Sequence, residues 1–297
     1  MKFTNTLALL ALIPSALSLP SPAVEQQGNG LAKREEKKKD TKYFHEAGGD
    51  EHLSHYDRRY FQGKVSYAEH RTVLRELIRS YVTNFEKMGA ETWIAHGTLL
   101  GWWWNGKIMP WDYDLDVQVS TATLRYLGEK WNQTTHEHTF VNSDGVTVNT
   151  TYLLDVNPHH IDIDRGDGQN IIDARWIDMS NGAFVDITGL AERDPANHPG
   201  VWSCKNYHRY KTTDLYPMRV TEYEGVKATI PYAFERILIG EYGTKSLVTT
   251  EWQGHRWQPD LKDWVKTPER IAQEEEKARK EAEEAAKKAA EEKNKSS

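Results

Sequence analysis

The sequence AHGTLLG at residues 95–101, followed by PWDYDLDVQV at residues 110–119, determines how the rest of the chain is interpreted. In the second stretch, Asp112, Asp114 and Asp116 alternate with aromatic or apolar residues. Because side chains alternate between the two faces of a β-strand, this period of two predicts a strand with all three carboxylates on one face and a buried back. Three like charges roughly 7 Å apart along a strand repel one another unless a cation or protons neutralise them.

The acidic segment is therefore a candidate metal site. Carboxylate oxygens are the ligands that hard divalent cations such as Mg²⁺ and Mn²⁺ prefer. The alternative is a solvated loop, since aspartate is common in turns. The apolar alternation that continues to Val119, after the Pro-Trp pair at 110–111, favours the strand.

A glycine and a hydroxyl residue precede the acidic segment. Gly97 and Thr98 follow a short strand-like run at residues 92–95. Glycine lets a backbone approach a phosphate, and a helix N-terminus attracts anions, so a Gly-Thr pair suits a phosphate contact at this point. The pair is a weak signal by itself, but its position shortly before an Asp-x-Asp strand is the spacing of the nucleotidyltransferase fold.

Together, these motifs resemble the LicD family of phosphotransferases, the relatives of fukutin and fukutin-related protein. The run HGTLLGWWWNGK at residues 96–107 is similar to the fungal members that are needed for adding mannosylphosphate to glycans. The resemblance covers about residues 90–245. It implies an α/β fold, with a nucleotidyltransferase-like mixed sheet flanked by helices, to which this chain adds a charged C-terminal helix or tail.

Asp186 lies in FVDI at residues 184–187, which resembles the second motif of the family. Alternation places Asp186 on the face opposite its apolar neighbours. In the family, a third carboxylate from a neighbouring strand completes the metal site, which implies Asp114, Asp116 and Asp186 as ligands of Mn²⁺ or Mg²⁺. Asp112 is then free to take a proton from the acceptor, so that all four aspartates are candidate catalytic residues. A surface or helix-capping role is the alternative for Asp186.

Several basic residues are candidate phosphate contacts. Arg175 offers a planar guanidinium, although an ion pair with Asp173 or Asp178 explains it equally well. Lys205 and His208 lie in a basic stretch at residues 204–211, which suits a diphosphate or forms a solvated edge. The full set of predicted substrate-binding residues is Gly97, Thr98, Lys107, Arg175, Lys205 and His208.

Three consecutive tryptophans occupy residues 102–104. Bacterial LicD-like sequences usually have small residues and an arginine there, so the resemblance provides no phosphate contact at these positions, and Lys107 is the expected substitute. Tryptophan rings stack on sugars and on bases, which is compatible with a mannose or guanine pocket. The alternative is a buried core, and we expect at least one of the three to be only that.

The chain of 297 residues, 38% of them hydrophobic, is long enough to bury a core. Residues 1–19 have the pattern of a secretory signal peptide, and a retained membrane anchor is the alternative. Composition predicts a disordered linker or propeptide at 20–42, a LicD-type domain at 43–265, and a tail rich in Lys, Glu and Ala at 266–297.

Composition also limits the partners and the compartment. The net charge of −6 argues against a nucleic-acid partner, because phosphate backbones are met by clustered Lys and Arg. Cys204 is the single cysteine, so no intramolecular disulfide forms. Glycosylation sequons begin at Asn132, Asn149 and Asn294. With the signal-like leader, they predict the secretory pathway, either the Golgi lumen or secretion.

Local patterns predict three further elements. Ser66 and Glu69 form a capping box for a helix with one apolar face, which ends at Met88 before a glycine. A helix follows at about residues 121–131, and a strand at residues 147–156.

The resemblance implies metal-dependent transfer of mannose-1-phosphate from GDP-mannose to a mannose hydroxyl of a cell-wall or protein-linked glycan, with release of GMP. The expected partners are a sugar nucleotide and a mannose-containing glycan. Three alternatives stay open. They are transfer of another phospho-substituent such as phosphocholine, a non-catalytic regulator that docks on a glycosyltransferase, and a secreted carbohydrate-binding protein built on the tryptophans.

Overall fold

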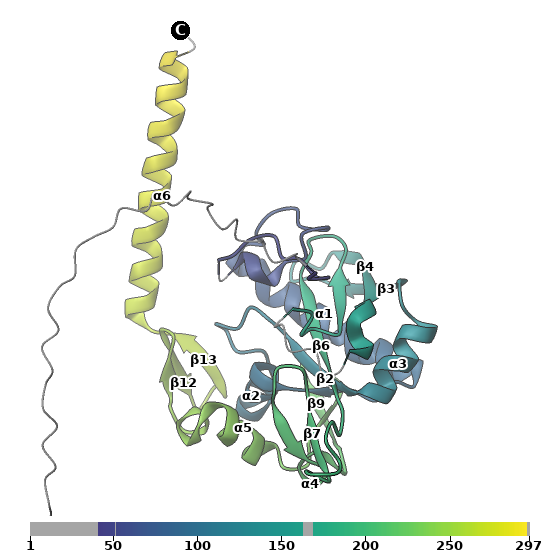
Figure 1. The fold of residues 1–297 in the computed structure, drawn as a ribbon. Coiled ribbons are helices and arrows are strands. Elements are labelled where there is room, and N and C mark those ends of the chain that lie inside the picture. The colour runs from purple at the N-terminus through teal and green to yellow at the C-terminus, as the bar shows by residue number, and fades with distance from the viewer. Residues whose placement is uncertain (1–40, 51, 163–168, 296–297) are drawn as a thin grey trace, which may run out of the picture. The chain divides into compact units, whose positions relative to one another are not determined.

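A computed structural model describes residues 41–50, 52–162 and 169–295. The predicted signal peptide and nearly all of the predicted linker lie outside these ranges. Within the described residues, the main element is a mixed sheet of six strands in the order β1-β2-β6-β5-β4-β3 (Figure 1). β2 and β6 are parallel, and the other neighbouring strands are antiparallel. This mixed sheet, flanked by helices, has the predicted α/β architecture and is consistent with a nucleotidyltransferase-like fold.

The strands of the main sheet are β1 (Trp93–Ile94), β2 (Asp116–Ser120), β3 (Thr134–Val141), β4 (Thr147–Val156), β5 (Ala174–Asp178) and β6 (Phe184–Leu190). The α-helices are α1 (Tyr67–Met88), α2 (His96–Asn105), α3 (Thr121–Lys130), α4 (Thr212–Leu215), α5 (Phe234–Tyr242) and α6 (Pro268–Lys295). The smaller sheets are β7 (Val201–Ser203) with β8 (Arg209–Lys211), β9 (Arg219–Tyr223) with β10 (Val226–Ile230), and β11 (Glu251–Trp252) with β12 (His255–Gln258) and β13 (Asp263–Lys266). Short 3₁₀ helices are η1 (Leu53–His55), η2 (Pro158–Ile161) and η3 (Thr244–Leu247).

The helix predicted from its capping box is α1. The Ser66 hydroxyl accepts a hydrogen bond from the Glu69 N–H at 3.3 Å and donates one to the Glu69 carboxylate at 2.6 Å. Gly89 ends the helix with a φ of 67°, the left-handed conformation that glycine adopts without strain. The predicted helix at 121–131 and strand at 147–156 correspond to α3 and β4. These elements follow the sequence closely because their signals are local.

Alternation along the strands gives the main sheet one apolar and one charged face. The apolar face carries residues such as Val117, Trp176 and Val185, and α1 and α3 pack against it. On the opposite face, strand register aligns four charged residues on adjacent strands, which we call the charged row. Its members are Asp116 on β2, Asp186 on β6, Arg175 on β5 and Asp155 on β4.

The sheet includes only the end of the acidic segment, which corrects the prediction from alternation. β2 begins at Asp116 and not at Asp112. The Asp112 N–H donates to the Met109 carbonyl at 3.0 Å and closes a turn. The pairing of β2 with β6 therefore starts only at Asp116. As a result, Asp112 and Asp114 belong to the loop before the strand, and the three carboxylates do not share one strand face.

The predicted charged C-terminal tail is helical in the part that the structure describes. In α6, Lys280 pairs with Glu276 at 2.7 Å, and Lys288 pairs with Glu284 at 2.9 Å. These pairs are spaced four residues apart, as expected for an exposed charged helix. None of the helices in the described ranges is both long enough and apolar enough to cross a membrane.

Candidate functional site

The motif before the acidic segment holds Asp116 in position. α2 begins directly after β1, and Thr98 in its first turn is only 2% exposed. The Thr98 Oγ1 accepts a hydrogen bond from the Asp116 N–H at 2.8 Å. The structure therefore gives Thr98 a positioning contact with the first residue of β2. The predicted phosphate contact of Thr98 stays a prediction.

Two glycines of the motif allow the acidic loop to approach α2. A Cβ atom at Gly97 would lie 2.9 Å from the Asp112 Oδ2. A Cβ atom at Gly101 would lie 2.4 Å from the Lys107 carbonyl oxygen, which is closer than non-bonded atoms come. A side chain at Gly97 would displace Asp112, and a side chain at Gly101 would displace the backbone at Lys107, so the two glycines permit the close approach of this loop to α2.

The aspartates make one another harder to ionise. Burial and a hydrogen bond with Asp114 hold the pKa of the Asp112 carboxyl well above its usual range. Burial and the nearby charge of Asp114 raise the pKa of Asp116 to about 8. Burial also raises the pKa of Asp186, although the guanidinium of Arg175 opposes this rise. A bound cation would relieve the repulsion within this group.

The donor chemistry of the aspartates suits a divalent cation, but their side chains do not surround one point. All are carboxylates, and the Asp116 carboxylate makes no hydrogen bond or ion pair with any residue that the structure describes. Within those same residues, no three His, Cys, Asp or Glu side chains are grouped closely enough to hold a metal ion. To bind a metal ion, the side chains of Asp114, Asp116 and Asp186 would therefore have to move closer to one another.

Arg175 bonds to protein carboxylates in the charged row. Its Nε donates to the Asp186 Oδ1 at 2.8 Å, and its Nη2 donates to the Glu46 Oε1 at 2.8 Å. Only 2% of its side chain is exposed. The alternative partners expected from the sequence, Asp173 and Asp178, are not its ion-pair partners among the described residues. Asp186 takes that place because it lies opposite Arg175 in the register of β5 and β6.

Lys107 and Lys205 also pair with carboxylates. The Lys107 Nζ lies 3.1 Å from the Asp263 Oδ2. The buried Lys205 Nζ lies 2.7 Å from the Asp173 Oδ1 and donates to the His159 carbonyl at 2.7 Å. The structure therefore places both predicted phosphate contacts in ion pairs, and neither lysine lines the two cavities beside Asp116.

His96 belongs to a hydrogen-bonded group that sequence reasoning missed. Its Nδ1 lies 2.9 Å from the Glu241 Oε2 of α5, and the Tyr210 hydroxyl donates to the Glu241 Oε1 at 2.7 Å. Burial favours the neutral ring of His96, but Glu241 outweighs burial and raises the pKa of His96. His96 is part of the quoted motif, whereas Glu241 lies 145 residues later, so no local pattern links them.

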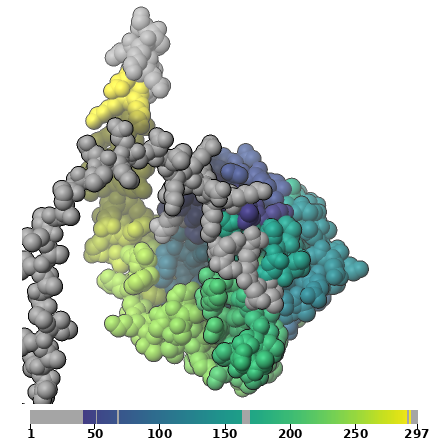
Figure 2. Space-filling model, in the orientation of Figure 1, coloured from purple at the N-terminus to yellow at the C-terminus, as the bar shows by residue number. Residues whose placement is uncertain are grey.

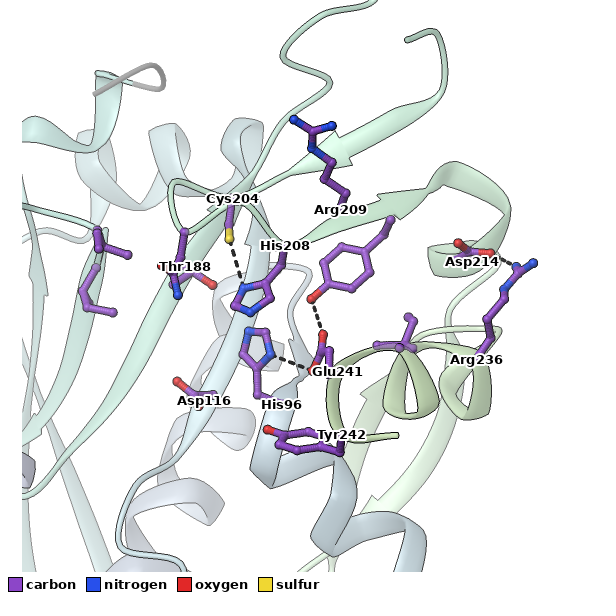
Figure 3. A pocket seen from close by; sticks show the side chains of 16 residues that line it. His96, Asp116, Thr188, Cys204, His208, Arg209, Asp214, Arg236, Glu241 and Tyr242 are labelled. Atoms are coloured by element: carbon purple, nitrogen blue, oxygen red, sulfur yellow. Dashed lines mark hydrogen bonds and ion pairs between the residues drawn. The ribbon is translucent and has the colours of Figure 1, made fainter. Parts of the chain in front are cut away.

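A cavity of about 670 Å³ opens beside this group (Figure 3). The rings of His96 and His208 face each other across 4.3 Å. Arg209 and Arg236 also line the cavity, and so does Asp116. Of the predicted phosphate contacts, only His208 lines this first cavity. Arg209 comes from the predicted basic stretch, while no sequence signal indicated Arg236.

A second cavity of about 580 Å³ shares Asp116 and Tyr242 with the first. Its other lining residues include Gly97, Asp112, Asp114, Lys245 and the four tryptophans Trp104, Trp111, Trp252 and Trp264. The tryptophans come from α2, the loop before β2, and the sheet of β11 to β13. Figure 2 shows the residues of that sheet, in light to yellowish green, as part of one continuous surface with α5.

The three consecutive tryptophans divide as expected between core and cavity. Trp102 and Trp103 pack against the hydrophobic core. Trp104 lines the second cavity, and its Nε1 donates to the Ser246 carbonyl at 3.1 Å.

Comparison with known protein families identifies the central part of the chain. Residues 89–233 match the family described as LicD/FKTN/FKRP, nucleotidyltransferase domain. This segment is a LicD domain. It contains the Gly-Thr motif, the acidic segment and Asp186. Glu241, Trp252 and Trp264 follow the matched LicD domain, so both cavities are completed by residues beyond it.

Two proteins of Saccharomyces cerevisiae are similar to this chain. Mannosyltransferase regulator 4 is 32% identical over 197 residues, which is 64% of this chain. Mannosyltransferase regulator 14 is 35% identical over 160 residues, which is 50% of this chain. The chain spans only 16% of the length of either relative. The LicD domain and these names support a role in glycan phosphotransfer or in its regulation.

Proposed function

We propose that this chain transfers mannose-1-phosphate from GDP-mannose to a mannose hydroxyl of a cell-wall or protein-linked glycan, in a reaction that depends on Mn²⁺ or Mg²⁺. The observation that carries this proposal is the position of Asp116. Its carboxylate has no bonded partner among the described residues, and it lines both cavities. A reactive group between two cavities can meet two substrates at once, which a transfer reaction requires.

The four aspartates divide into two roles. Asp114, Asp116 and Asp186 are the proposed ligands of the cation, which when bound neutralises charge on the diphosphate. The acceptor oxygen attacks the phosphorus that carries the mannose, the bond from this phosphorus to the GMP oxygen breaks, and GMP leaves. Asp112 takes the proton of the acceptor hydroxyl. Its raised pKa makes the ionised carboxylate a stronger base.

The first cavity is the proposed site of the donor diphosphate. His208, Arg209 and Arg236 line it, and guanidinium groups bind phosphate oxygens in a bidentate manner. We assign His208 and Arg209 the role that the sequence had predicted for Lys107, Arg175 and Lys205, because those three side chains pair with carboxylates, as Arg236 does with Asp214. Gly97 and Thr98 are proposed to position the acidic loop and Asp116.

A second candidate function is a non-catalytic regulator that docks on a glycosyltransferase in the secretory pathway. Two observations favour it. Both yeast relatives are named as regulators of a mannosyltransferase. In the part of the chain that the structure describes, the carboxylates are also not grouped for metal binding. Such a regulator would bind its partner without turning over a nucleotide.

Isothermal titration of the full chain tests the proposal. GDP-mannose and CDP-choline are each titrated with Mn²⁺ or with EDTA, and the second nucleotide tests transfer of phosphocholine as the alternative. We expect Mn²⁺-dependent binding of GDP-mannose that disappears in Asp114→Ala. The matched control is Asp144→Ala, in the exposed turn between β3 and β4, which should bind normally. If neither nucleotide binds to folded protein, the regulator is the better interpretation.

A further inference from the structure

We propose that the second cavity binds a neutral hexose ring of the acceptor glycan. This assignment rests on the proposed function and adds to it, because it states which cavity receives which substrate. We call this cavity the aromatic cavity, after its lining residues Trp104, Trp111, Trp252 and Trp264.

The ring geometry of the aromatic cavity favours a flat, non-ionic ligand. The rings of Trp111 and Trp264 meet at 83° with centroids 4.9 Å apart, and those of Trp104 and Trp264 meet at 70° and 4.8 Å. Rings crossed in this way form adjacent walls instead of a closed stack. An aromatic face carries negative potential and therefore attracts the weakly positive C–H groups on one side of a pyranose ring.

Two tryptophans of the cavity, one through a polar atom and one through its apolar surface, have no partner of their own. The Trp264 Nε1 is buried without a hydrogen-bond partner among the described residues, and the whole residue is only 5% exposed. A buried N–H without a partner is costly, and a sugar hydroxyl would satisfy it. Trp252 lines the same cavity and is 57% exposed, a large apolar surface to leave in water.

The charges of the two cavities separate donor from acceptor. Among the described residues, two arginines and two histidines line the first cavity, whereas Lys245 is the one basic residue that lines the aromatic cavity, which is therefore the less suited of the two to a diphosphate. Hydroxyl groups of a neutral sugar instead donate hydrogen bonds to carboxylates. Asp112, the proposed proton acceptor, lines the aromatic cavity and not the first cavity. The attacking hydroxyl must therefore enter from the aromatic side.

Binding of mannobiose to the full chain tests the assignment, in EDTA and without nucleotide, by saturation-transfer NMR and calorimetry. The decisive variant is Trp252→Ala, because its exposed side chain can be removed without opening the core. We expect mannobiose to bind the wild type and to bind Trp252→Ala at least tenfold more weakly, equivalent to about 1.4 kcal/mol. The control Tyr207→Ala removes an aromatic ring that is 64% exposed and lines neither cavity. It should bind like the wild type.

The outcomes separate this assignment from the proposed function. Absence of mannobiose binding to the wild type at tens of millimolar, or equal binding by Trp252→Ala, overturns the assignment. It is also overturned if Trp252→Ala weakens guanosine binding but not mannobiose binding, since the cavity would then hold the base. If mannobiose binds as expected while GDP-mannose with Mn²⁺ does not bind, the transferase function fails and the sugar site stands.

Discussion

Replacing Arg175 with methionine removes a cation that hydrogen-bonds to two carboxylates of the protein and lies 4.0 Å from a third, that of Asp57. The guanidinium contacts Asp186 and Glu46 at 2.8 Å each and is 2% exposed. Methionine keeps much of the side-chain length, so the change mainly removes charge and hydrogen bonds. Removing one partner of a buried ion pair costs about 3–5 kcal/mol. We expect about 3 kcal/mol, because Asp186 and Glu46 are 18% and 20% exposed and keep some contact with water.

The cost of Arg175→Met should decrease at acidic pH. Burial opposes ionisation of Glu46, but its hydrogen bonds from Lys42 and Arg175 lower its pKa. The lowered pKa stabilises the fold above a pH of about 4.3, and this stabilisation is lost as the pH falls below that value. Burial already raises the pKa of Asp186, and loss of Arg175 raises it further. Ionised Asp186 then destabilises the variant at neutral pH, and protonation removes this penalty as the pH falls. The difference between wild type and variant is therefore largest at neutral pH.

Urea unfolding of both proteins, followed by circular dichroism at neutral pH and near the carboxyl pKa, measures this effect. The control is Arg256→Met, which breaks an exposed ion pair with Glu251 of 2.9 Å and should cost less than about 1 kcal/mol. Equal costs for the two variants would refute the reasoning. So would a cost of Arg175→Met that grows as the pH falls.

Three other variants test the site and its support. Gly101→Ala should lower the free energy of unfolding, measured by thermal denaturation, by about 1–2 kcal/mol. The clash of the new Cβ atom with the Lys107 carbonyl costs about 1–3 kcal/mol, and the higher helix propensity of alanine offsets up to about 1 kcal/mol of this cost. Burial and two neighbouring histidines lower the pKa of His70 to about 4, so the wild type should lose up to about 3 kcal/mol between pH 6.5 and 4. In His70→Phe, the free energy of unfolding measured by urea titration should change less between these two pH values. A change as large as that of the wild type would show that His70 is not its cause. Asp116→Asn should raise stability by about 0.5–2 kcal/mol and abolish Mn²⁺-dependent nucleotide binding; a variant that still responds to Mn²⁺ would exclude Asp116 as a ligand.

The sequence predicted those elements whose signals are contained within them. Ser66 and Gly89 mark the two ends of α1, and the strand predicted at residues 147–156 has the observed bounds of β4. The start of β2 was predicted too early because alternation continues through the turn that Asp112 closes with Met109. A strand ends where its pairing ends, and pairing depends on a neighbour that is distant in the sequence.

The candidate site shows the same limit. The motif located Asp116, but the charge partner of Arg175 depends on the register of β5 and β6. Lys107 reaches Asp263, and His96 reaches Glu241, across more than a hundred residues of chain in each case. Sequence spacing carries no information on such contacts, so basic residues could be identified but not assigned to phosphate or to carboxylate.

The uneven neutralisation of the aspartates favours catalysis over regulation alone. Arg175 compensates Asp186, whereas the Asp116 carboxylate has no bonded partner among the described residues, and its pKa is raised. A regulator could bind its partner without this unpaired buried carboxyl group and would be more stable with a residue that never ionises there. An active site accepts such a cost, because a carboxyl group that awaits a cation must remain unpaired in its absence. Since Asp116 lies where two cavities meet, its electrostatic cost and its position have a common explanation in group transfer.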